Sequence, residues 1–179
     1  MEKKKRAPKT KPSTPSRKRM NQKKAIQKLA ALLAANFVPG DLLITLTYDP
    51  DCEGIDRPTA IKYLRAFLRS FRGVRNKRRK NLLYLHSTLS PGIGERVQHQ
   101  VVLNAAGNDL EELQSLWRYG EVEAEVFEPG IDYAALAKRL TSGIHEANAN
   151  SWVPSYSLVR PPDSTPRGIY PEAGVGDRW

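Results

Sequence analysis

The class of fold rests on residues 36–48, which read Asn36-Phe37-Val38-Pro39-Gly40-Asp41-Leu42-Leu43-Ile44-Thr45-Leu46-Thr47-Tyr48. The Pro39-Gly40 pair is typical of a break between two elements. The apolar run after it, with Thr45 and Thr47 interleaved, predicts a β-strand over residues 41–48. An Asp-Pro-Asp turn follows, so the strand has a clear end on both sides.

We expect a helix before this strand and a disordered basic arm before the helix. Residues 21–35 carry apolar side chains at helical spacing, and Asn21 can cap the helix. Residues 1–20 combine Lys and Arg with three prolines and have almost nothing to bury. Such an arm binds nucleic acid by releasing counterions from the phosphates. A solubilising tail is the alternative function.

After this strand, helical and strand patterns alternate along the chain. They predict helices at 58–72 (stopped by Gly73), 109–117 and 133–141, and strands at 82–89, 97–104 and 122–126. The order β-α-β-β-α-β indicates an α+β fold with a split βαβ sheet, as in ferredoxin-like and RRM-like domains. Its helices are expected on one face, with the other face open. The expected regions are a disordered arm (1–20), an α+β domain (21–145) and an irregular tail (146–179).

The composition excludes several classes of protein. The chain has 179 residues, 40% of them hydrophobic, and no apolar run long enough to span a membrane. No hydrophobic segment follows the basic start, so a secretory signal is not expected. The single cysteine, Cys52, excludes a disulfide framework and a cysteine-built zinc site. We therefore expect a cytoplasmic protein of a bacterial host cell.

The net charge of +10 is unevenly distributed along the chain. Residues 1–24 hold eleven Lys/Arg and one acid, which leaves the rest neutral overall. Within the rest, residues 57–80 hold ten bases and no acid, whereas residues 109–132 hold eight acids and one base. A basic helix face followed by a basic loop predicts contact with a polyanion. The expected DNA-binding residues are Lys62, Arg65, Arg69, Arg72, Arg75, Lys77, Arg78, Arg79 and Lys80.

Three groups of side chains are candidates for other chemistry. His86 and His99 lie on the two hairpin strands, where they form either a metal-binding pair or ordinary buried hydrogen bonds. The alternating acids of the 122–126 strand either hold a divalent cation or face water; they are Glu121, Glu123 and Glu125. The aromatic residues available for stacking on bases are Tyr48, Tyr84, Tyr119, Trp152 and Tyr156. Glycine motifs that bind nucleotide phosphates are absent from the sequence.

Several segments resemble, in the same order, the motifs of rolling-circle replication-associated (initiator) proteins. Residues 36–48 resemble the first strand motif of the gene-II-like initiators of filamentous phages and of related proteins of bacterial mobile elements. The other similar segments are 66–69, 83–85, 96–104, 116–120, 136–141 and 155–161. The resemblance therefore spans about residues 21–162.

The resemblance implies a single-strand DNA endonuclease of the His-hydrophobic-His type. In this family, two histidines at positions i and i+2 of a strand bind Mg²⁺ or Mn²⁺, often with a Glu from the neighbouring strand. A helix-borne tyrosine attacks the scissile phosphate and becomes covalently joined to the 5′ end of the DNA. Retention of the activity would therefore require Mg or Mn.

The catalytic positions implied by the resemblance carry other residues in this chain. The histidine pair falls on Gln98 and Gln100, the Glu falls on or near Leu89, and the tyrosine falls on Arg139. Neutral amides alone make a poor metal site, and Arg cannot act as the nucleophile. We therefore expect a chain that keeps the fold, has lost or weakened the nicking reaction, and holds no metal or cofactor.

Three functions remain open from the sequence. The first is a monomeric protein that binds single-stranded or origin DNA without nicking, alone or beside an active replication initiator. The second is an active nickase with Tyr133 as a displaced nucleophile, assisted by Glu95 or His99. The third is a general single-stranded nucleic-acid-binding module that shares only the fold.

Overall fold

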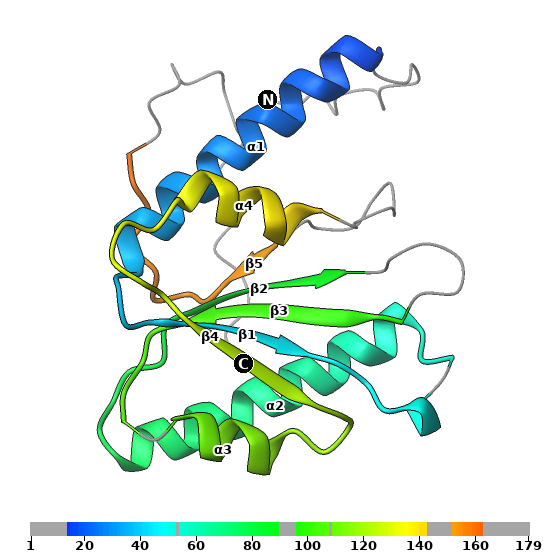
Figure 1. Ribbon diagram of the computed structural model, residues 1–179, viewed down its shortest axis with the longest axis vertical. Helices are drawn as coiled ribbons and strands as arrows, with labels where there is room; N and C mark the ends of the chain where they lie inside the picture. The colour runs from blue at the N-terminus through cyan, green and yellow to red at the C-terminus, as the bar shows by residue number, and fades with distance from the viewer. Residues whose placement is uncertain (1–13, 53, 90–95, 108, 143–151, 163–179) are drawn as a thin grey trace, which may run out of the picture.

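The computed structural model describes residues 14–52, 54–89, 96–107, 109–142 and 152–162. Within these residues, a five-stranded antiparallel sheet lies between two layers of helices (Figure 1). The strands are β1 (Leu42–Leu46), β2 (Tyr84–Leu89), β3 (Gln98–Leu103), β4 (Val122–Val126) and β5 (Val153–Pro154). The helices are α1 (Pro15–Asn36), the 3-10 turn η1 (Pro50–Cys52), α2 (Arg57–Lys77), α3 (Asp109–Leu116) and α4 (Tyr133–Thr141).

The strand order confirms the α+β class and the split βαβ core. The sheet runs β4-β1-β3-β2-β5, so the first and third strands are central and antiparallel neighbours. Helices α2 and α3 are the two crossovers, and they pack side by side on one face of the sheet. This arrangement is the one that β-α-β-β-α-β connectivity produces.

The prediction of an open second face is wrong, because α1 and α4 cover it. Leu29 and Leu33 of α1 and Leu140 of α4 pack on Leu43 and Val102 of the central strands. The reason is visible in β1 and β3, which carry consecutive apolar residues instead of alternating ones. A strand of this kind is apolar on both sides and needs a covering layer on each.

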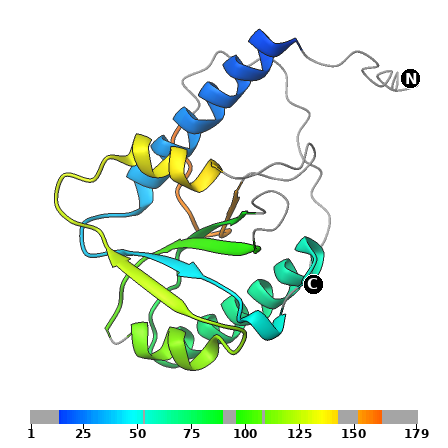
Figure 2. The same cartoon turned by 45° about the vertical axis from the view of Figure 1, so that its right-hand side comes forward.

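Helix α1 begins earlier than the predicted start at Asn21. The Thr14 hydroxyl accepts a hydrogen bond from the backbone N–H of Arg17, and Pro15 occupies the first helical turn. Both residues favour a helix start, so residues 15–20 of the expected disordered arm are helical. Residues 14–24 are exposed, and this end of α1 extends away from the sheet (Figure 2). Residues 1–13 of the expected arm lie outside the described residues.

Helix α2 passes through Gly73, which was predicted to stop it, and ends at Lys77. Asp56 caps its start by accepting a hydrogen bond from the Thr59 N–H at 3.1 Å. The additional residues continue the buried stripe of the helix to Arg75. A single glycine costs a helix interior only about 1 kcal/mol, which tertiary packing of this stripe offsets.

The two edges of the sheet differ. At one edge, the tail residues Val153 and Pro154 form β5, and the Ser155 N–H donates to the Tyr84 carbonyl at 2.7 Å. At the other edge, Val122 and Ala124 of β4 pack against the α2–α3 core as predicted, whereas Val126 is 58% exposed. The intervening acids of β4 are exposed. Among the described residues, no helix is both long and apolar enough to cross a membrane.

Candidate nucleic-acid interface

The exposed side of α2 carries a stripe of positive charge. Lys62, Arg65, Arg69 and Arg72 follow one another at spacings of three and four residues, so they share one face of the helix. All four are exposed, and none forms an ion pair within the part of the chain that the structure describes. We call these four residues the α2 stripe. Their charge is available to an external partner.

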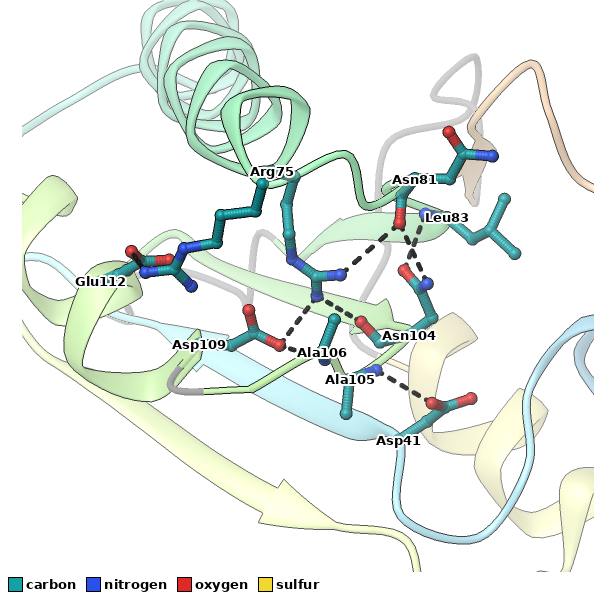
Figure 3. A network of polar contacts seen from close by, with 10 residues as sticks. Asp41, Arg75, Asn81, Leu83, Asn104, Ala105, Ala106, Asp109 and Glu112 are labelled. Carbon is teal, nitrogen blue, oxygen red and sulfur yellow. Dashed lines mark hydrogen bonds and ion pairs between the residues drawn. The ribbon is translucent and has the colours of Figure 1, made fainter.

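Two of the nine predicted DNA-binding residues form ion pairs with acids of the same chain; Figure 3 shows the contacts of the first, Arg75. Arg75 is fully buried, and its guanidinium lies 2.8 Å from Asp109 and donates to the Asn104 carbonyl at 2.5 Å. Arg78 forms an ion pair with Glu112 of α3. The prediction for Arg75 is wrong because α2 is longer than expected. Lys77, the last residue of α2, is exposed, and so are Arg79 and Lys80 after it.

An aromatic surface adjoins the α2 stripe on β2. The Arg72 guanidinium lies over the Tyr84 ring, 5.5 Å from its centre, and donates to the Tyr84 hydroxyl at 3.4 Å. The Tyr84 ring is stacked beside His86, with centroids 6.1 Å apart. Burial and the nearby Arg65 charge lower the pKa of His86 to about 4, so this imidazole is neutral at pH 7. The stripe thus combines cations with a half-buried ring, as nucleic-acid-binding surfaces do.

His99 is a core residue, and other side chains hydrogen-bond to both of its ring nitrogens. Its two ring nitrogens lie 2.8 Å from the Tyr48 hydroxyl and 2.9 Å from the Thr88 hydroxyl. Burial lowers the pKa of His99 to about 3. The described residues contain no group of three or more metal-ligating side chains. Of the two alternatives for His99, ordinary buried hydrogen bonds are the one that the structure shows.

The two glutamines share one face of the sheet, and only Gln100 is buried there. Gln98 and Gln100 point to the face that α1 and α4 cover, and Leu89 is directly opposite Gln98 in the register. Gln100 is 5% exposed, and its neighbour Ser87 across β2 is 1% exposed. The Gln100 Oε1 and Ser87 Oγ atoms have no hydrogen-bond partner among the described residues.

Arg139 is separate from these glutamines. Its guanidinium forms two hydrogen bonds with Glu125 of β4, at 2.8 and 2.6 Å, which lower the pKa of this carboxyl group. Since β1 lies between β4 and β3, the four family-equivalent positions do not converge on one point. Two neutral amides and a leucine also do not fit a divalent cation, so we derive no metal-dependent step.

Tyr133 has a structural role. Its hydroxyl donates a hydrogen bond to the Phe37 carbonyl at 2.6 Å, at the junction of α1 and β1. This contact fixes the start of α4 against the end of α1. Glu95, the other residue considered for this alternative, lies outside the described residues.

Replacing Tyr133 by Phe is expected to lower the free energy of unfolding by about 0.5–1.5 kcal/mol, because one partly buried hydrogen bond is lost. The measurement is urea unfolding of parent and variant. With labelled single-stranded DNA and Mn²⁺, neither protein is expected to retain label through SDS electrophoresis. A parent adduct that disappears in Tyr133→Phe would show that this tyrosine is a nucleophile.

The aromatic residues considered for base stacking fall into different environments. Tyr48 is buried, and burial raises the pKa of its hydroxyl. Tyr119 is stacked on Tyr63, with ring centres 4.1 Å apart. The residue after Tyr119 must be glycine, since a Cβ at Gly120 would lie 2.2 Å from the Thr47 carbonyl oxygen. Tyr156 is 99% exposed.

Sequence reasoning missed a second basic surface between α1 and the tail. A groove of about 560 Å³ is lined there by Lys24, Lys28 and Arg160, together with Trp152. A signal was present in the sequence, because residues 15–36 contain no acidic residue. The groove lies on the side of the sheet opposite the α2 stripe.

No protein-family model, curated protein or solved structure matches this chain. The resemblance to rolling-circle initiators therefore stays a prediction from motifs.

Proposed function

We propose that this chain binds DNA as a monomer, through the α2 stripe, and does not nick it. The observation that carries this proposal is the set of four exposed cations on one helix face, with no acid in residues 57–80. A protein face of one sign that is not neutralised internally attracts a polyanion. Tyr84, held beneath Arg72, offers a ring edge at the same surface.

The proposed biological setting is replication of a phage, plasmid or integrated mobile element in the cytoplasm of a bacterial host. The collinear initiator-like motifs and the β4-β1-β3-β2 order support this setting. The bound DNA is single-stranded or origin DNA, and an active initiator supplies the nick. Loss of nicking agrees with the neutral amides of Gln98 and Gln100, which cannot replace the family's histidines.

Replacing Arg65 and Arg69 together by Ala is expected to weaken DNA binding and its salt dependence. On duplex DNA, the slope of log K against log salt should become shallower by about 1.8, since about 0.9 is lost for each phosphate contact. The measurement is a fluorescence anisotropy titration at several salt concentrations. Arg72 is left in place because it contacts Tyr84.

The matched control is the double variant Arg118→Ala/Lys138→Ala. It removes the same charge from two exposed positions outside α2. We expect the slope of the control to equal that of the parent. Equal slopes for all three proteins would exclude the α2 stripe as the DNA-binding surface. Tighter binding of RNA than of single-stranded DNA of the same sequence would favour the general nucleic-acid-binding module.

A further inference from the structure

The groove between α1 and the tail segment 152–162 combines three cations with an aromatic ring. Lys24 and Lys28 lie one turn apart on α1, and Arg160 lies across from them on the tail. Among the described residues, no acidic side chain lines the groove. Its volume of about 560 Å³ lies within the range of pockets that hold small ligands.

Trp152 forms the apolar part of this groove. The residue is half-buried, because it packs on the core cluster that α1 and α4 form on the sheet. The remaining exposed part lines the groove, beside Pro154. A ring that is held in place and exposed on one side can stack on a base of any sequence.

The charges of α1 disfavour the free helix. Its first turn holds Arg17 and Lys18 and no acid, although the positive end of the helix dipole favours acids there. Arg19 and Lys23 are a repelling pair at i and i+4. A bound polyanion relieves this repulsion, so the charge pattern is complementary to a phosphate backbone.

Hydrogen bonds outside the groove attach the tail segment to the end of α1 and to β2. The side chain of Asn36, at the end of α1, accepts from the Val159 N–H and donates to the Val159 carbonyl, both at 2.7 Å. The Ser155 N–H donates a hydrogen bond to the carbonyl of Tyr84 on β2, and the Ser155 hydroxyl accepts one from the Tyr84 N–H. The two walls therefore have a fixed separation before any ligand binds, which lowers the entropy lost on binding.

We propose that this groove binds a single-stranded nucleic acid, with a base on Trp152 and its phosphates on Lys24 and Arg160. The inference rests on the proposed function for the class of ligand, but it uses different residues. Since the groove and the α2 stripe lie on opposite sides of the sheet, the protein holds two segments of nucleic acid at once. It thereby acts as a bridge between a single strand and a second strand or duplex.

The direct test is photocrosslinking of the full chain to a thymidine oligonucleotide that contains 5-bromodeoxyuridine. Tandem mass spectrometry of the digest is expected to place the adduct on Trp152. Adducts on Tyr84 alone would overturn the groove as a site and leave the α2 stripe in place.

The second test compares affinities for the same oligonucleotide. Lys24→Ala/Arg160→Ala is expected to weaken binding roughly tenfold and to reduce the salt slope by about 1.4, since single strands lose about 0.7 for each contact. Trp152→Leu keeps apolar packing and is expected to weaken binding roughly tenfold through lost stacking. Circular dichroism and thermal unfolding verify that both variants are folded.

The α2 variant Arg65→Ala/Arg69→Ala separates the two proposals. The groove proposal expects this variant to retain the Trp152 adduct. If Lys24→Ala/Arg160→Ala binds the oligonucleotide as tightly as the parent and the α2 variant binds it more weakly, the groove is not a binding site. The same result would support the proposed function of the α2 stripe. Absence of binding to both duplex and single strand by the parent overturns both. The control for charge removal is again Arg118→Ala/Lys138→Ala.

Discussion

Replacing Arg75 by Met is expected to lower the free energy of unfolding by about 3–5 kcal/mol, because it leaves the Asp109 carboxylate buried without its counter-charge. Arg75 and Asp109 are 0% and 1% exposed. In the variant, the Asp109 carboxylate would keep one hydrogen bond among the described residues, from the Ala106 N–H at 2.6 Å. The Asn104 carbonyl also loses a donor. The measurement is urea unfolding at pH 7.

The neighbouring Arg78 provides a matched control for this variant. Its ion pair with Glu112 is partly exposed, with the Arg78 side chain 42% accessible. Exposed pairs contribute about 0–1 kcal/mol, so Arg78→Met should have a small effect. The double variant Arg75→Met/Asp109→Leu should recover most of the loss, since it leaves no unpaired charge. If Arg75→Met and Arg78→Met are equally stable, the buried ion pair does not stabilise the fold.

Acidification from pH 7 to pH 5 is expected to cost the fold about 2 kcal/mol for each of His86 and His99. The pKa values of about 4 and about 3 lie below the ordinary value of 6.5. At pH values between 6.5 and these lower values, both imidazoles bind protons in the unfolded chain but not in the folded one. Stability is therefore fully present above pH 6.5 and falls with pH toward the folded-state values. The measurement is the free energy of unfolding at half-unit steps of pH.

The variant His86→Gln/His99→Gln identifies the source of this acid sensitivity. It lacks both buried imidazoles, and the glutamine introduced at position 99 has an amide that can bond Tyr48 or Thr88. We expect this variant to be less stable than the parent at pH 7 but nearly independent of pH between 7 and 5. A parent whose stability is constant over this range would show that the two imidazoles accept protons in the folded state. Ordinary carboxyl groups titrate mostly below this window.

Much of the fold could be predicted from local patterns. The bounds of β4 and α4 were predicted correctly, because period-two and helical spacing are both distinct there. The placement of α1 over the second face could not be predicted by the same method. Helical spacing identifies the apolar side of a helix, but it does not say which surface of the protein that side packs on. The consecutive apolar residues in β1 and β3 were the available signal. Strand β5 has only two residues, one of them proline, so it leaves no pattern in the sequence.

The charged site was less predictable than the fold. The sequence locates the bases of α2, but whether a base is free depends on where the helix ends and what packs beside it. Arg75 follows Leu64, Leu68 and Phe71 at helical spacing, so its burial could be predicted once the helix is extended past Gly73. The groove joins α1 to residues more than 120 positions away, as in the Asn36–Val159 contact, and local patterns carry no information at this separation.

The two edges of the sheet also determine how copies of the chain meet. Pro154 has no N–H to offer a further strand at the β5 edge. At the β4 edge, antiparallel pairing of two copies would bring Glu121 and Glu123 close to their equivalents, and like charges in such positions repel. Both features oppose the pairing of one sheet edge with another.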